Sequence, residues 1–231
     1  MLGLGKAWRV VEARLDANAS ALVLKMEATP DLWPEEDARD GTPVTCCDHI
    51  EPMQWRHLNA FNKECVIVCA LPRWRRANDG SMYRVTPLWE GRSKHFTQEF
   101  EAFALTLMRE MPVKRGGEIL GESDSRMWGT LFTHVKAAYE RLSFPNVVWV
   151  GADETNRRNG HNYLTVFADL VAKRVIFATP GKDASVWEAF AGELLRNNGH
   201  PKAIQYAAND MSAVYIKEVS DNPGERVSGV R

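Results

Sequence analysis

Two aspartates in the second half of the chain each end a segment that begins like a buried strand. Asp153 follows the apolar run Val147–Val150, and Asp210 follows the run Ala203–Ala208. Ligands of open α/β sheets collect at the carboxyl ends of strands, where two carboxylates would repel each other. A divalent cation that prefers oxygen ligands, such as Mg²⁺, relieves that repulsion. Two such ions roughly 3.5–4 Å apart can activate a water or a 3′-hydroxyl and stabilise the leaving oxygen of a phosphodiester.

The elements that must position these aspartates form a recognisable order. Three strand-like runs are followed by an amphipathic helix and a fourth strand, and they are Val147–Asp153, Tyr163–Ala168, Arg174–Thr179, Ala184–Asn197 and Ala203–Ala208. This is the order of the opening half of a ribonuclease-H-like α/β domain, in which the first and fourth strands are parallel neighbours. We therefore expect Asp153 and Asp210 to meet at one edge of the sheet.

A simpler interpretation of both aspartates is that they cap the structure that follows. An aspartate after a strand commonly stabilises the next turn. Asp210 precedes Met211, where a helix is expected to start, and aspartate is a favoured residue at that position. The pattern alone leaves both interpretations open.

The amino-acid sequences of several segments resemble one family of proteins. In the second half these segments are VGADETNRRNGHNYLTVFADL, RVIFATPGKDASVWEAF and NDMSAVYIKEV, and upstream they are WRHLNAF, CALPR, HFTQEFEAFALTLMREMPV and GESDSRMW. Together, and in this order, they resemble the DDE transposases of bacterial insertion sequences, specifically the ISL-three family. The resemblance runs from about Val10 to Asn222.

The resemblance implies a function and a set of partners. Asp153 would be the first catalytic acid and Asp210 the second, both as ligands of Mg²⁺ or Mn²⁺. The activity would be hydrolysis at the transposon ends followed by attack of a 3′-hydroxyl on target DNA. The partners would be the inverted repeats of the transposon and the target DNA, in the bacterial cytoplasm near the nucleoid.

The family places its third acid, a glutamate, well downstream of the second, and this sequence offers no matching position before Arg231. The resemblance therefore predicts a C-terminally truncated and inactive copy with an incomplete ribonuclease-H-like domain. The exposed sheet edge that missing strands would leave also predicts self-association. Two alternatives remain: a non-catalytic DNA-binding remnant that recognises inverted repeats or interferes with an intact transposase, and a product that does not fold.

Composition indicates a globular protein and gives little sign of nucleic-acid binding as a whole. The 231 residues carry a formal net charge of −1, and 45% are hydrophobic. Local charge differs, because residues 55–94 carry a net charge of +5 and residues 1–54 carry −5. Such a basic stretch can attract DNA even when the whole chain is neutral. No apolar run approaches 18 residues, so no membrane span is expected.

Residues 1–94 are expected to form a β-rich module that is a degenerate relative of a zinc ribbon. Trp8–Leu15 and Ala21–Ala28 read as a β-hairpin. The cysteine spacing argues against zinc: Cys46 and Cys47 would point to opposite sides of a strand, and Cys65 and Cys69 would be about 13 Å apart along one. Buried apolar thiols are the better interpretation.

Residues 95–143 predict a helix-turn-helix, and residues 144–231 the truncated catalytic domain. Thr97 caps a first helix, a second short helix begins after Pro112, and a third follows the turn at Gly121. The alternative is a plain three-helix packing unit. We expect Met127, Trp128 and Phe132 of the third helix to be core.

The residues expected to contact DNA fall into three groups. The first is the basic cluster around Trp74, the second is the helix-turn-helix with its third-helix start in the major groove, and the third is the loop after Asp153. Their members are Arg73, Arg75 and Arg76; Lys114, Arg115, Ser123, Ser125 and Arg126; and Arg157 and Arg158. For the first group, an exposed hairpin tip without a role is an equally good interpretation.

Overall fold

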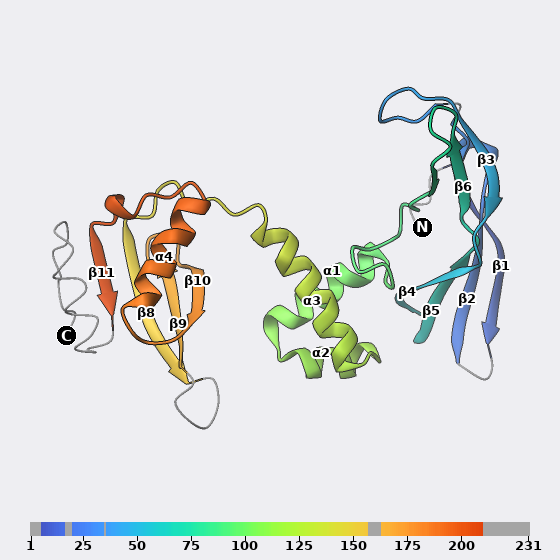
Figure 1. Cartoon of the computed structure of the whole chain (residues 1–231). Helices are drawn as coiled ribbons and strands as arrows, with labels where there is room; N and C mark the ends of the chain where they lie inside the picture. Colours follow the sequence, from blue (N-terminus) through green and yellow to red (C-terminus); the bar gives the residue numbers. More distant parts are fainter. Residues whose placement is uncertain (1–5, 17–19, 35, 157–162, 210–231) are drawn as a thin grey trace. The chain divides into compact units, whose positions relative to one another are not determined.

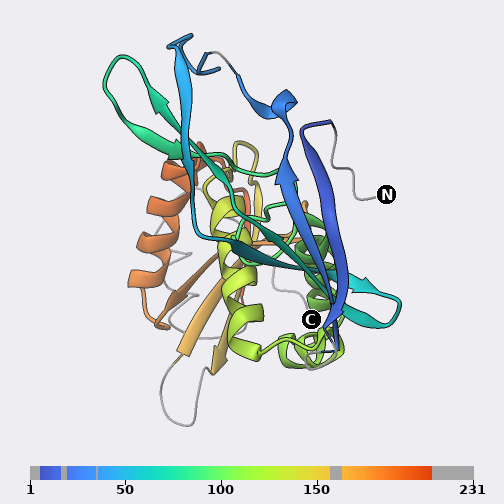
Figure 2. The same ribbon diagram turned by 90° about the vertical axis from the view of Figure 1, so that its right-hand side faces the viewer.

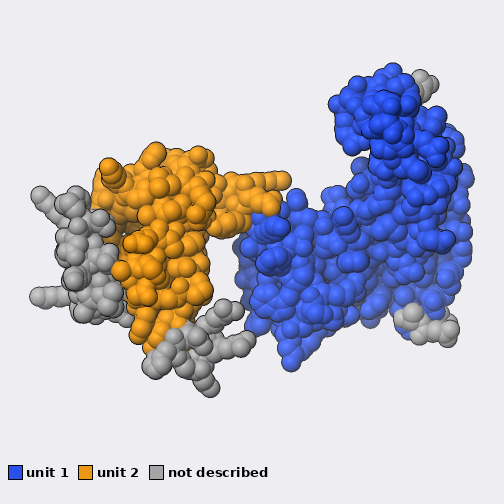
Figure 3. All heavy atoms as spheres, in the orientation of Figure 1, with its two compact units in different colours: residues 1–138 blue, residues 139–231 orange. Residues whose placement is uncertain are grey.

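A computed structural model describes residues 6–16, 20–34, 36–156 and 163–209 of the chain. The chain divides into two compact units, residues 1–138 and residues 139–231 (Figure 3). The described residues form two hydrophobic cores in the first unit and one in the second. No helix among the described residues is both long and apolar enough to cross a membrane.

The first unit begins with two sheets (Figure 1). One sheet has the strand order β1-β2-β5-β4 and the other has the order β3-β6-β7. The predicted hairpin is confirmed, because the first two strands pair antiparallel from Trp8↔Ala28 to Asp16↔Ala21. In the view of Figure 2 this hairpin is the long dark blue pair of strands. The strands are β1 (Trp8–Asp16), β2 (Ala21–Ala28), β3 (Val44–His49), β4 (Met53–Ala60), β5 (Lys63–Cys69), β6 (Pro72–Arg76) and β7 (Met82–Arg84).

The core under the first sheet is built around three tryptophans. Trp89 packs edge-on against Trp8 and Trp55, with ring centroids 4.8 and 5.8 Å apart. Cys69 and Ile67 complete the buried face of β5, because alternate residues of a strand point to the same side. Residues 30–32 form a short 3₁₀ turn before β3.

Three helices follow in the first unit: α1 (Gln98–Glu110), α2 (Val113–Leu120) and α3 (Asp124–Tyr139). Thr97 caps α1 as predicted, since its side-chain oxygen accepts a hydrogen bond from the backbone N–H of Phe100. Gly121 ends α2 in the left-handed conformation with φ of 74°, which favours glycine. A separate core lies among these helices and includes Phe100, Ala104 and Met127.

The second unit is a mixed sheet of order β10-β9-β8-β11 with one helix on it (Figures 1 and 2). Its elements are β8 (Trp149–Asn156), β9 (Tyr163–Asp169), β10 (Arg174–Pro180), α4 (Ser185–Arg196) and β11 (Tyr206–Asn209), with a 3₁₀ turn at Pro201–Ala203. The predicted element order is confirmed, as is the parallel pairing of the first and fourth strands, which joins β8 to β11.

Helix α4 covers one face of this sheet because its apolar stripe matches the inward side chains of the strands. Phe190 stacks on Phe167 of β9 with ring centroids 4.3 Å apart, and Trp187 meets the same ring edge-on at 5.0 Å. Val150 and Ala152 of β8 lie in the same core. These contacts hold β8 and β9 in the register that positions Asp153.

Candidate catalytic and DNA-contact sites

Asp153 lies inside strand β8 and not at its end. The strand continues to Asn156, and Asp153 pairs with Val166 of β9. This corrects the expectation that the strand stops at Asp153 and that a loop follows it directly. The pairing with β9 extends β8 because that whole segment has a partner strand, so the polar residues 153–156 still find backbone hydrogen bonds.

The side chain of Asp153 faces away from helix α4. Val150 and Ala152 are buried in the core under α4, while Asp153 is exposed. Because side chains alternate along a strand, Gly151 and Asp153 share the opposite face. Among the described residues no hydrogen-bond or ion-pair partner holds the Asp153 carboxylate, so its oxygens are available to a ligand.

The pairing of β11 with β8 extends to Asn209 and Ala152, the residues that immediately precede the two predicted acids. Asn209 pairs with Ala152, the last of four consecutive parallel pairs that begin with Tyr206↔Trp149. Paired residues of neighbouring strands are about 4.8 Å apart, and consecutive α-carbons are about 3.8 Å apart. Asp210 itself lies outside the described residues. Arg157 and Arg158 also lie outside them.

The predicted helix-turn-helix segment is held to the first sheet by a buried arginine. Arg56 of β4 is only 6% exposed and lies with its Nε 3.8 Å from the Glu122 carboxylate in the α2–α3 turn. Its guanidinium also donates to the backbone oxygen of Leu120, at the end of α2, over 3.4 Å and covers the ring of Phe100. Sequence reasoning missed Arg56, because nothing in the local pattern of β4 distinguishes it from an outward-facing charge.

Glu122 links this buried arginine to Arg126, one of the predicted DNA contacts. Arg126 donates to Glu122 over 2.5 Å, and its guanidinium lies 4.5 Å from the ring centroid of Phe96. Burial raises the pKa of Glu122, and the two arginines oppose that rise. The side chain of Arg126 nevertheless remains 46% exposed, so it has access to solvent at the start of α3.

The other predicted contacts of this segment lie on its surface. Lys114 and Arg115 are exposed in the first turn of α2, and Arg115 forms an ion pair with Glu118 over 2.9 Å. Ser123 and Ser125 are exposed at the α3 start, with their hydroxyl oxygens 3.3 Å apart. All of these side chains are therefore accessible to a ligand, unlike the buried Met127 behind them.

The basic cluster of β6 is largely neutralised by acids of the preceding segment. Arg73 forms a two-point hydrogen-bonded ion pair with Asp48, and Arg76, whose side chain is 12% exposed, binds Asp37 and Asp40. Arg39 and Arg76 hold the pKa of Asp37 well below its ordinary value through hydrogen bonds and charge. Arg75 is exposed, and it is the member of the cluster that remains open to an outside phosphate.

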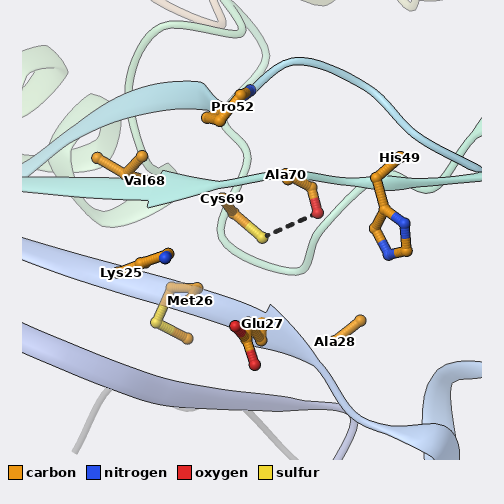
Figure 4. Close-up of a pocket in the computed structure, with 9 residues that line it drawn as sticks. All are labelled: Lys25, Met26, Glu27, Ala28, His49, Pro52, Val68, Cys69 and Ala70. Carbon is orange, nitrogen blue, oxygen red and sulfur yellow. Dashed lines mark hydrogen bonds between the residues drawn. The ribbon is translucent and has the colours of Figure 1, made fainter.

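A cavity of about 390 Å³ lies at the carboxyl ends of the parallel strands β2 and β5 (Figure 4). The Cys69 thiol at its wall donates to the backbone oxygen of Ala70 over 3.7 Å. Burial raises the pKa of this thiol to about 12, so it is protonated at neutral pH. All four cysteines are free, and the described residues contain no cluster of three or more His, Cys, Asp or Glu side chains suited to a metal.

A comparison with protein families finds a match in the second unit. Residues 150–225 match the model of the ISL-three family of DDE transposases, whose description is transposase. The predicted resemblance is thereby confirmed over about a third of the chain. The matched range contains both Asp153 and Asp210. No curated protein matches the chain.

Proposed function

We propose that this chain is a DNA transposase of an insertion sequence, which binds transposon-end DNA and takes part in metal-dependent strand cleavage and transfer. The match of residues 150–225 to the transposase family carries the proposal, because this range holds both predicted acids. The parallel pairing of β8 with β11 supports it independently. The catalytic unit would be the ribonuclease-H-like domain predicted from the order of its elements.

In this proposal Asp153 and Asp210 hold the metal together. Asn209, the residue before Asp210, pairs with Ala152, the residue before Asp153, and this pairing supports a shared site for the two acids. If β11 continues by one residue, Asp210 becomes the register partner of Asp153. Because side chains alternate, both carboxylates then leave the same face of the sheet, opposite the buried Ala207 and Val150.

The residues present fit Mg²⁺ or Mn²⁺. Asp153 offers an exposed carboxylate that forms no ion pair with a described lysine or arginine. Hard divalent ions prefer such oxygen ligands. A bound ion would lower the pKa of a coordinated water or 3′-hydroxyl and stabilise the leaving oxygen. The role of the chain is to fix the two carboxylates on neighbouring strands, so that little reorganisation is needed when the phosphodiester arrives.

The DNA contacts we propose are the surface cations and hydroxyls of the helix-turn-helix segment. Lys114 and Arg115 would neutralise phosphates, and Ser123, Ser125 and Arg126 at the α3 start would enter the major groove. From the β6 cluster, Arg75 is the stronger candidate, since Arg73 and Arg76 already have carboxylate partners. Arg157 and Arg158 remain proposed phosphate contacts beside Asp153.

Metal affinity tests this function without requiring cleavage, which matters because no residue of this chain is assigned as the third acid. Titration of the full chain with Mn²⁺, followed by the loss of its free-ion paramagnetic resonance signal, measures binding directly. Asp153→Asn and Asp210→Asn are each expected to weaken binding by at least about tenfold. Glu154→Gln is the matched control, because Glu154 is the adjacent carboxylate on the other face of β8. Unchanged affinity in both aspartate variants would refute the shared site.

A further inference from the structure

Arg126, at the start of α3, is held in one orientation by a buried acid and an aromatic ring. Its Nη1 donates to Glu122 over 2.5 Å, and its guanidinium carbon lies 4.5 Å from the ring centroid of Phe96. Phe96 is 1% exposed and stacks in turn on Phe100, with ring centroids 4.5 Å apart. The ring fixes the plane of the guanidinium and the carboxylate fixes its direction in that plane. The orientation of Arg126 is therefore set before any ligand arrives.

The carboxylate that holds Arg126 is itself fixed in position. The Glu122 side chain is 5% exposed, and its second oxygen, Oε1, lies 3.8 Å from Nε of the buried Arg56. Burying a carboxylate between two arginines is costly, because charged groups lose their hydration, and apolar side chains would hold the turn at least as well. Buried ion pairs are best explained where they specify one geometry, and here that geometry is the orientation of Arg126.

A second ion-paired arginine of this segment is held much more loosely. Arg115 pairs with Glu118 over 2.9 Å, but the two side chains are 65% and 50% exposed. Such a surface pair contributes little and rearranges at little cost, which suits a contact to the phosphate backbone. Arg126 has a buried partner that does not move away in the same manner. The contrast indicates that Arg126 meets a ligand whose acceptor atoms have fixed positions.

The open side of the Arg126 guanidinium has the geometry that guanine requires. Within the part of the chain that the structure describes, its Nε and Nη2 form no hydrogen bond, and the side chain is 46% exposed. These two nitrogens present parallel N–H groups in one plane, and O6 and N7 of guanine accept such a pair in the major groove. In a helix-turn-helix, the residues at the start of the second helix are those that reach base edges.

We propose that Arg126 is a specificity-determining residue that reads a guanine, and that Glu122 is the positioning residue that acts through it. The inference rests on the DNA-binding function proposed above and deepens it, because it names the base and separates this base contact from the phosphate contacts. Nε and Nη2 would donate to the two guanine acceptors while Nη1 keeps its bond to Glu122. Little side-chain freedom is lost on binding, because the arginine is already oriented.

Selection from a pool of DNA duplexes with a randomised central stretch, bound to the full chain and then sequenced, tests the proposal. The wild type is expected to enrich a motif that contains an invariant G·C pair. Arg126→Gln removes the parallel donors, so discrimination at that pair should fall about tenfold while the preferences at the other positions remain. Glu122→Gln keeps the shape of the turn but removes the charge that orients Arg126, so it should weaken the preference at the same pair only.

A similar ion pair in the second unit provides the matched controls. Arg196 donates to Glu193 over 2.6 Å, and the arginine is exposed while the glutamate side chain is 6% exposed. Arg196→Gln and Glu193→Gln should therefore leave the motif unchanged. Circular dichroism checks folding. If Arg126→Gln does not fold, Arg126→Lys keeps the charge beside Glu122 without the planar donor pair, and it should weaken the guanine preference at the same position.

Four results would overturn the inference, and they separate it from the proposed function. A motif unchanged by the Arg126 variants would do so, as would an equal loss of affinity for every duplex, which would make Arg126 a phosphate contact. A motif unchanged by a folded Glu122→Gln chain would remove the positioning role. In these three cases the DNA-binding function stands. A wild-type chain that enriches no sequence would refute sequence-specific DNA binding and this inference with it.

Discussion

At the scale of single residues, the pKa of a buried carboxylate in the first unit depends on the hydrogen-bond donors around it. Glu101 of α1 is 2% exposed and accepts hydrogen bonds from the backbone N–H groups of Arg92 and Ser93, at 2.9 and 2.8 Å. A ring nitrogen of His134 lies 2.6 Å from the same carboxylate. Burial alone would raise the pKa of Glu101, but these donors together hold it below its ordinary value of 4.5.

This depressed pKa makes part of the folding stability depend on pH. A carboxyl whose pKa is lower in the folded state stabilises the fold above its unfolded pKa, and that contribution is lost as the pH falls through the folded value. We therefore expect Glu101→Gln to lower the free energy of unfolding at pH 7 by about 1–3 kcal/mol. The difference from the wild type should shrink below pH 4.5, in urea titrations at a series of pH values. A difference that is constant from pH 7 to pH 3 would contradict this.

At the scale of elements, the order of secondary structure around Asp153 could be predicted because period and composition change clearly there. The β-branched and aromatic runs of β8 to β10 and the helical spacing of Val186, Phe190 and Leu194 are local signals. The end of β8 could not be predicted, because the residues after Asp153 are polar and only their pairing with β9 makes them a strand.

Surface and core faces of helix α3 were distinguished only in part. Met127 is buried as predicted, whereas the predictions for Trp128 and Phe132 were wrong. Apolar character indicates that a side chain gains from burial, but it does not tell which neighbour buries it. The pairing of Arg73 with Asp48 and of Arg76 with Asp37 joins residues far apart in the sequence, so charge counting alone could not reveal it.

The attachment of the α2–α3 turn to β4 gives a test at this scale. Arg56→Met removes the buried partner of Glu122 and leaves that carboxylate with Arg126 alone, so the free energy of unfolding should fall by about 3–5 kcal/mol. Arg14→Met, which breaks an exposed pair with Glu12, should cost at most about 1 kcal/mol. Equilibrium urea unfolding measures both variants.

A second substitution that restores stability to Arg56→Met separates the electrostatic role of Arg56 from its packing role. Adding Glu122→Gln to Arg56→Met should recover part of the lost stability, because the buried charge is then removed as well. A double variant that is as unstable as Arg56→Met, or an Arg56→Met chain that is as stable as the wild type, would show that the pair does not hold the turn in place.

At the scale of the whole molecule, the net charge does not indicate the surface that we propose for DNA binding. The chain carries −1 overall, and many of its arginines are already paired with acids within the first unit. DNA affinity should therefore depend on a few exposed cations, and it should fall steeply with salt because each neutralised phosphate releases counterions.

Gel shifts with transposon-end DNA at a series of salt concentrations measure how many of these exposed cations contact phosphates. The double variant Lys114→Gln and Arg115→Gln should weaken binding and reduce the slope of log affinity against log salt by about 2. Lys63→Gln is the control, since Lys63 is an exposed cation at the start of β5 and outside the proposed contacts. A slope unchanged by the double variant would remove Lys114 and Arg115 from the DNA surface.

The proposed function requires that Asp153 and Asp210 share one cation at the junction of β8 and β11. A crystal structure of the chain with Mn²⁺, located by its anomalous scattering, tests it most directly. We expect a metal ion coordinated by carboxylate oxygens of both aspartates, at about 2.1 Å as for similar hard cations, on the sheet face opposite α4. Carboxylates that leave opposite faces of the sheet, or an ion bound to neither aspartate, would contradict it.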